Sequence, residues 1–163
     1  MLLEARITRL EDIERLRERV VEFFELCDTG GSTGEAYNPK ALASLFLPNG
    51  CFESGELRCM GRPSMEALFA DLAQTFCLHY AGNYVFDVRP GSDAAYGHWS
   101  AWETPVLSGK AVWGCFVHRH SYRKRDGEWY WLNWDQTIKF FVPVSDSWEQ
   151  ADRIVEQRLS HGA

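Results

Sequence analysis

Residues 112–142 read V-W-G-C-F-V-H-R-H-S-Y-R-K-R-D-G-E-W-Y-W-L-N-W-D-Q-T-I-K-F-F-V and predict the class of the whole fold. Aromatic and β-branched residues fill both halves of this stretch, which is the composition typical of strands. The Asp126-Gly127 dipeptide between the halves is typical of the tight turn of a hairpin. We therefore expect two long antiparallel strands, 112–124 and 129–142, joined by that turn.

Further strands are predicted upstream of this hairpin. Two of them cover 80–89 and 94–103, and the Pro90-Gly91-Ser92-Asp93 turn joins them. Two shorter strands are expected earlier, at 51–54 and 57–60. Because the long strands gather in the second half of the chain, after mostly helical sequence, the pattern indicates an α+β fold.

The helices are predicted from apolar periodicity and from signals at their ends. The first has apolar residues every three to four positions, and we expect it to begin at a capping box at Thr8 and to end at Asp28. A short second helix is expected to begin at Asn38-Pro39 and to stop at Pro48-Asn49-Gly50. Gly61-Arg62 opens a third helix.

Length and composition limit the class of protein. With 163 residues, 45% hydrophobic, the chain is expected to form one domain over 1–163, with a C-terminal helix at about 147–160 that a capping box at Ser147 opens. The formal net charge of −6 argues against nucleic acid or an anionic membrane as a partner. Five cysteines without the spacing of a zinc site, and no recognisable signal peptide, predict a reduced cytoplasmic protein.

Two titratable residues lie at the predicted ends of helices. Asp28 follows the first helix and His79 follows the third, each directly after apolar residues. If both ends meet at one cavity, the carboxylate can accept a hydrogen bond from one ring nitrogen and leave the other nitrogen as a base. An imidazole suits proton abstraction near neutral pH. The alternative is that Asp28 only caps the glycine-rich loop and that His79 packs at the edge of the core.

Several local motifs together resemble the nuclear transport factor 2 superfamily. They are Asp28 after an aromatic pair, the run Leu45-Phe46-Leu47-Pro48-Asn49-Gly50-Cys51-Phe52, Gly61-Arg62 at a helix start, His79 before a strand, and Arg125-Asp126-Gly127-Glu128-Trp129 in the last hairpin. Within the superfamily, the chain is most similar to the SnoaL-like branch, which includes scytalone dehydratase, bile acid 7α-dehydratase and hexachlorocyclohexane dehydrochlorinase.

This resemblance implies a fold and a catalytic pair. The implied fold is a cone-shaped, curved antiparallel sheet wrapped around the long N-terminal helix and enclosing an apolar cavity. The lyases of the branch carry an Asp-His dyad, which falls on Asp28 and His79. Where some of them have a second polar group one helical turn before the acid, this chain has Phe23. We therefore expect the missing acid to come from elsewhere, or the reaction to need a different leaving group.

Further cavity residues are sought on the strands and in the glycine-rich segment. His118 shares a strand face with Phe116, and the resemblance places it where scytalone dehydratase has a substrate-binding Asn, so it is the first candidate for a hydrogen-bond donor. Its alternative interpretation is a ring packed between aromatics. His98 is a candidate second acid, Tyr37 is a candidate lid residue, and Phe23 and Phe116 are candidate substrate-binding residues. Which face of the strand that carries His98 points inward stays open.

The last strand offers one more candidate, Trp131. Strict alternation places Trp131 and Asn133 on one face of that strand and Trp134 on the other, and one face is expected to line the cavity or a subunit interface. No metal is expected, because the His118-Arg119-His120 pair has no third ligand at a recognisable spacing. No cofactor is expected either, since the chain has no phosphate loop or dinucleotide fingerprint.

These residues lead to the hypothesis of a cofactor-independent lyase (dehydratase) or isomerase that acts by general acid-base catalysis. The expected partner is an apolar, ring-containing small molecule of polyketide, terpenoid or steroid-like type. A polyketide cyclase and a noncatalytic binding or assembly module are the alternatives. The open sheet with its tryptophans and the C-terminal amphipathic helix predict a homo-oligomer. The resemblance favours a trimer over a dimer, since similar dehydratases are trimers and other relatives are dimers.

Overall fold

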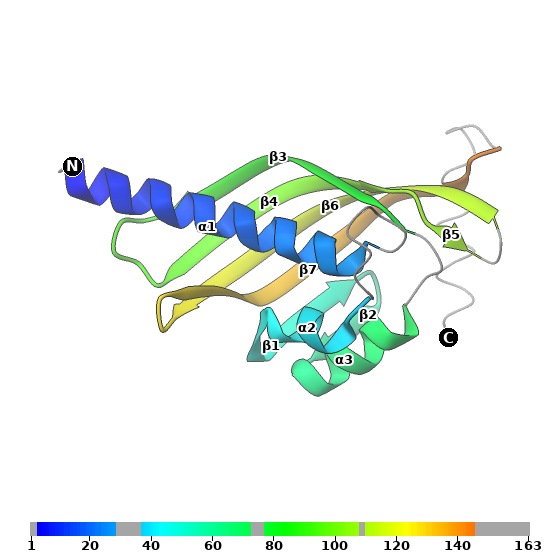
Figure 1. Ribbon diagram of the computed structural model, residues 1–163, viewed down its shortest axis with the longest axis horizontal. Helices are drawn as coiled ribbons and strands as arrows, with labels where there is room; N and C mark the ends of the chain where they lie inside the picture. Colours follow the sequence, from blue (N-terminus) through cyan, green and yellow to red (C-terminus); the bar gives the residue numbers. More distant parts are fainter. Residues whose placement is uncertain (1–2, 29–36, 73–76, 108–109, 146–163) are drawn as a thin grey trace.

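A computed structural model describes residues 3–28, 37–72, 77–107 and 110–145, and within these residues three helices pack with a curved sheet (Figure 1). The helices are α1 (Leu3–Cys27), α2 (Pro39–Ser44) and α3 (Arg62–Asp71). The strands are β1 (Phe46–Ser54), β2 (Leu57–Met60), β3 (His79–Val88), β4 (Ala94–Glu103), β5 (Val106–Leu107), β6 (Lys110–Arg125) and β7 (Glu128–Pro143). The predicted α+β class is confirmed, and the predicted C-terminal helix at 147–160 lies outside the described residues.

The strands form one sheet in the order β2-β1-β7-β6-β4-β3, and β5 pairs with β6. β6 and β7 are the hairpin expected from the sequence, and Asp126 and Gly127 at its turn both have positive φ. β1 and β7 are parallel, so the sheet is mixed, and the expectation of an antiparallel sheet is wrong for this pair. A long connection through α3 and most of the sheet separates these two strands, so no hairpin turn makes them antiparallel.

β1 contains the residues at which the second helix was expected to stop. α2 ends earlier, at Ser44, and Pro48-Asn49-Gly50 form an irregularity inside the strand, where β1 advances by five residues while β7 advances by two. Proline cannot donate to a sheet ladder. Gly50 is required by a close approach, because a Cβ atom there would lie 3.1 Å from the backbone oxygen of Leu47 and 3.2 Å from that of Trp131.

α1 lies along one face of the sheet (Figure 1), and one side of the helix packs into the core. It begins at Leu3, so Thr8 lies inside the helix and the prediction that it caps the start is wrong. The residues before Thr8 are mostly good helix formers, and nothing in them stops the helix. The predicted end is confirmed, since the backbone N–H of Asp28 donates to the carbonyl of Phe24 at 2.8 Å as the helix closes.

Aromatic rings fill most of the space between α1 and the sheet. Trp131 and Trp134 are almost fully buried, and the ring of Phe23 lies 4.4 Å from that of Trp134. Both tryptophans point inward because the register of β7 on β6 shifts at Leu132, which adds one residue to β7. The prediction that Asn133 shares a face with Trp131 is therefore wrong, since strict alternation does not hold across a bulge.

Candidate active site

The end of α1 and the start of β3 bring Asp28 and His79 together. Oδ1 of Asp28 accepts a hydrogen bond from the backbone N–H of His79 at 3.0 Å, and it lies 2.7 Å from Nδ1 of the same residue. Phe24 stacks on the imidazole, with ring centroids 4.9 Å apart. One carboxylate and one stacked ring thus fix the orientation of His79. The catalytic role of the pair stays a prediction.

The other ring nitrogen of His79 faces Glu103, a residue that the sequence did not single out. Nε2 lies 3.2 Å from Oε2 of Glu103, and the two residues are direct partners in the ladder between β3 and β4. Glu103 shares the inward face of β4 with the buried Trp99 and Ala101. Alternation on β4 could have found it, but only the register shows which of the two faces points inward. The expectation that Nε2 is free is therefore corrected.

His79 lies between two carboxylates in a largely buried site. The side chains of Asp28, His79 and Glu103 are 21%, 13% and 13% exposed. Burial by itself favours a neutral ring, but hydrogen bonds with Asp28, Cys77 and Glu103 outweigh it and raise the pKa of His79 well above its ordinary value. The resting ring is therefore an imidazolium at neutral pH. The proton on Nε2 lies between this nitrogen and Oε2 of Glu103, and either atom can hold it.

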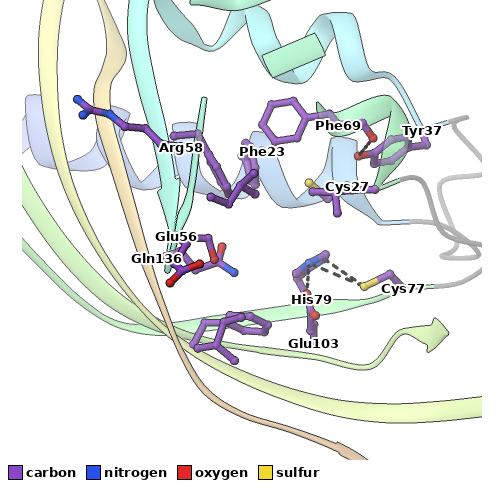
Figure 2. Close-up of a pocket in the computed structure, with 16 residues that line it drawn as sticks. Phe23, Cys27, Tyr37, Glu56, Arg58, Phe69, Cys77, His79, Glu103 and Gln136 are labelled. Atoms are coloured by element: carbon purple, nitrogen blue, oxygen red, sulfur yellow. Dashed lines mark hydrogen bonds and ion pairs between the residues drawn. The ribbon is translucent and has the colours of Figure 1, made fainter. Parts of the chain in front are cut away.

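A cavity of about 720 Å³ opens beside His79, a volume in the range of small-molecule sites (Figure 2). Most of its wall is apolar and comes from α1, α3, β1, β6 and β7: Phe23, Phe52, Phe69, Leu72, Phe116 and Ile138. Figure 2 shows Cys77 and His79 on one side of this cavity and Glu56 and Gln136 on the other. The cavity therefore has one polar side at His79 and another at Gln136, and most of the rest of its wall is apolar.

Four of the predicted site residues line this cavity: Phe23, Tyr37, His79 and Phe116. The hydroxyl of Tyr37 donates to the backbone carbonyl of Phe69 at 2.7 Å, which holds Tyr37 against α3. Asp28 is not among the lining residues and contacts the site through His79. It is therefore placed to orient the ring and to stabilise its positive charge.

Three other predicted site residues lie away from the cavity. His98 is on the exposed face of β4, because that strand turns Trp99 inward. Trp131 is fully buried in the aromatic core beneath α1. His118 is only 3% exposed and packs between Trp99 and Phe116, with ring centroids 5.7 Å and 6.0 Å away. The expectation that these three residues line the cavity is therefore corrected, and His118 is the packed ring of the alternative interpretation.

His118 and His120 form a stacked pair of buried histidines, with ring centroids 5.6 Å apart. Within the described residues, none of their four ring nitrogens has a hydrogen-bond partner. Burial lowers the pKa of His118 to about 3 and that of His120 well below its ordinary value. Both rings are therefore neutral and act as aromatic packing beside Trp99 and Trp134.

Cys77, His79 and Glu103 have ligand atoms within 4.8 Å of one another, close enough to share a metal ion. Two features favour a proton there instead. Both ring nitrogens of His79 already lie within hydrogen-bond distance of carboxylates, so an ion would have to displace Glu103 from Nε2. Burial raises the pKa of Cys77, which favours the thiol over the thiolate that metals prefer.

Comparisons with known proteins agree on the fold. The model of a family described as "SnoaL-like domain" matches residues 8–135. No curated protein matches the chain. In addition, no helix in the described parts of the chain is long and apolar enough to cross a membrane.

Solved structures with a similar fold cover most of this chain. A type 2 hexachlorocyclohexane dehydrochlorinase (LinA) has a TM-score of 0.73 at 16% identity, covering 86% of this chain and 94% of its own. A putative scytalone dehydratase from Novosphingobium aromaticivorans has a TM-score of 0.70 at 13% identity, with coverages of 86% and 97%. An NTF2-like protein with a cystatin-like fold, also from Novosphingobium aromaticivorans, has a TM-score of 0.69 at 22% identity, with coverages of 90% and 91%. At these identities, the similarity establishes the fold.

Proposed function

This chain belongs to the SnoaL-like domain family, and from that membership and its site geometry we propose that it is a lyase or isomerase acting on a ring-containing small molecule. The observation that carries the proposal is the position of His79, whose two ring nitrogens lie 2.7 Å and 3.2 Å from carboxylates at the wall of a largely apolar cavity. A histidine that shares a proton with a glutamate can both take and give protons.

Glu103 supplies the acid that Phe23 cannot. When the Nε2 proton moves to Glu103, Nε2 becomes a base and the Glu103 carboxyl becomes an acid, 3.2 Å apart. Asp28 keeps its hydrogen bond to Nδ1 throughout, so the ring stays oriented and its positive charge is stabilised when it forms. The side chains of His79 and Glu103 are largely buried, and this partial removal from water strengthens the electrostatic interaction between them.

In a dehydration, the protons and electrons then balance within this pair. Nε2 takes a proton from the carbon next to a carbonyl, and the electron pair of that C–H bond forms the new double bond. The Glu103 carboxyl gives its proton to the departing hydroxyl, whose C–O bond breaks, and water leaves. His79 is then an imidazolium and Glu103 a carboxylate, as in the resting state. In an isomerisation, Nε2 returns its proton to a different carbon.

The composition of the cavity wall favours catalysis over a noncatalytic binding or assembly module. A module that only binds an apolar ligand needs no titratable pair at the wall, whereas here His79 and Glu103 both line the cavity. Two structural neighbours, a dehydrochlorinase and a putative scytalone dehydratase, bear the names of elimination enzymes. A cyclase would use the same proton transfer at a carbon next to a carbonyl, so it remains within the proposed chemistry.

Two neutral bicyclic ketones test the proposal. 1-Tetralone reports proton abstraction through deuterium exchange at the carbon next to its carbonyl in D₂O, and 3-hydroxy-1-tetralone reports loss of water through formation of 1-naphthol. We expect both reactions to exceed the protein-free rate. We expect His79→Ala to lower them by about 10²- to 10⁴-fold, and Glu103→Gln to lower dehydration more than exchange.

Glu66→Gln is the matched control for Glu103→Gln, because it makes the same substitution on the exposed side of α3. It should leave both rates within about twofold of the unmodified protein. Circular dichroism of each variant checks that the fold is retained. Rates in His79→Ala equal to those of the unmodified protein would overturn the proposed mechanism.

A further inference from the structure

The polar end of the cavity opposite His79 has two neutral side chains that the proposed chemistry does not use, Ser54 and Gln136. They are direct partners in the parallel ladder between β1 and β7, both line the cavity, and both are half-buried. Figure 2 shows Gln136 across the cavity from His79. Among the described residues, no group forms a hydrogen bond with the Gln136 carboxamide or the Ser54 hydroxyl. Each of these side chains both donates and accepts hydrogen bonds.

The charges around this end disfavour an anionic ligand. Arg58 is already paired with Glu53, at 3.0 Å, and its side chain is 63% exposed. Glu56 also lines this end, and Glu103 lines the other. A carboxylate or phosphate would therefore meet Glu56 and an arginine already paired with Glu53 at this end. At the other end it would meet a His79 imidazolium whose charge Asp28 and Glu103 already balance. A hydroxyl or carbonyl oxygen matches Ser54 and Gln136 without this repulsion.

We infer that the ligand is a neutral ring compound with two oxygens at opposite ends, one at His79 and Glu103 and the other bound by Gln136 and Ser54. The inference rests on the proposed function, because it names the substrate class of the same cavity. The rings of Phe23, Phe52 and Phe116 also line the cavity and give the apolar body of the ligand its contact area. Holding both ends selects which carbon faces Nε2.

Two probes that differ by one hydroxyl test this inference by isothermal titration calorimetry. 2-Naphthol can use only one polar end at a time, whereas naphthalene-2,6-diol carries hydroxyls at both ends of the same ring system. A neutral hydrogen bond contributes about 2- to 12-fold in affinity. We expect the diol to bind the unmodified protein more tightly than 2-naphthol by a factor in that range.

The matched variants are Gln136→Leu, which keeps the approximate volume of the side chain, and Thr137→Val, the next residue of β7, whose side chain points to the other face of the sheet. Gln136→Leu should reduce the preference for the diol to about the statistical factor of two that its symmetry gives. Thr137→Val should leave it unchanged. An undiminished preference in Gln136→Leu, or no binding of either probe to the unmodified protein, overturns the inference.

These outcomes are separate from those of the catalytic test. If neither tetralone reacts but the preference for the diol depends on Gln136, the proposed function fails and the binding inference stands. If the tetralones react with dependence on His79 while Gln136→Leu keeps its preference for the diol, the function stands and the second oxygen is not recognised there.

Discussion

Acidification from pH 6.5 to pH 4.5 is expected to destabilise the fold through His118 and His120. Both rings are at most 4% exposed, and burial lowers the pKa of His118 to about 3 and that of His120 well below its ordinary value. In the unfolded chain each ring regains an ordinary pKa of about 6.5. The unfolded state therefore binds more protons than the folded state below pH 6.5, so the free energy of unfolding falls as the pH falls.

The magnitude follows from the proton count. For His118, the slope rises from about half of 1.36 kcal/mol per pH unit at pH 6.5, where the unfolded ring is half protonated, to nearly the full value at pH 4.5. The free energy of unfolding therefore falls by about 2 kcal/mol between these two pH values. His120 adds to this loss with the same sign. His79 has the opposite sign, because its raised pKa stabilises the fold fully below pH 6.5 and this contribution is lost as the pH rises through the folded pKa. These three histidines therefore predict a stability maximum near pH 6.5.

Urea denaturation followed by tryptophan fluorescence at pH 4.5, 6.5 and 8.5 measures this dependence. The double variant His118→Phe/His120→Phe keeps two flat aromatic rings but removes both titrating groups, so the loss between pH 6.5 and 4.5 should shrink by at least about 2 kcal/mol. His98→Gln is the control, since His98 is exposed on the outer face of β4, and it should keep the full dependence. An acid loss in the double variant equal to that of the unmodified protein would refute the reasoning.

Two further predictions concern residues that support the fold. Asp12 is buried, and its Oδ1 accepts hydrogen bonds from Lys124 at 2.6 Å and from the indole of Trp129 at 3.0 Å. Asp12→Ala leaves both donors without this partner and should lower the free energy of unfolding, measured by urea denaturation, by about 3 kcal/mol. Asp93→Ala is the control, because it removes an exposed ion pair with Arg123, and it should lower the same free energy by less than about 1 kcal/mol. Gly50→Ala places a Cβ atom 3.1–3.2 Å from two backbone oxygens and should cost about 1–3 kcal/mol, while Gly82→Ala meets nothing within 4 Å and should cost less. Equal losses at the two glycines, measured by thermal unfolding, would contradict the close approach of β1 and β7.

The sequence predicted features that depend on local pattern. Alternation correctly placed Phe116 and His118 on one face of β6, because the register of that segment against β4 is unbroken. The signals at the ends of the helices also brought attention to Asp28 and His79, which the structure places 2.7 Å apart. The first inference depends only on the two-residue period of a strand, and the second depends only on where the sequence signals the end of a helix.

Features that depend on register could not be predicted in this way. Alternation on β4 places Glu103 on one of two faces, but the sequence does not show which of these faces points inward. Only the pairing of β4 with β3 and β6 distinguishes them. The bulge at Leu132 turns Trp134 inward, although the local pattern gives no sign of it. Pro48-Asn49-Gly50 has the composition of a turn, yet it lies within β1, because β7 approaches Gly50 closely enough to continue the pairing on either side.

The acid-base pair depends on a residue that has no side chain. Gly114 on β6 is the ladder partner of Glu103, and a Cβ atom there would lie 2.8 Å from Cγ of Glu103 and 2.7 Å from the ring of Phe141. A side chain at this position would have to displace the stem of Glu103, and with it the carboxylate that lies 3.2 Å from Nε2 of His79. The site is thus assembled by α1 through Asp28, by β3, by β4 and by the space that β6 leaves open. Because the sheet register fixes three of these four contributions, the geometry of His79 and Glu103 is set before any ligand arrives.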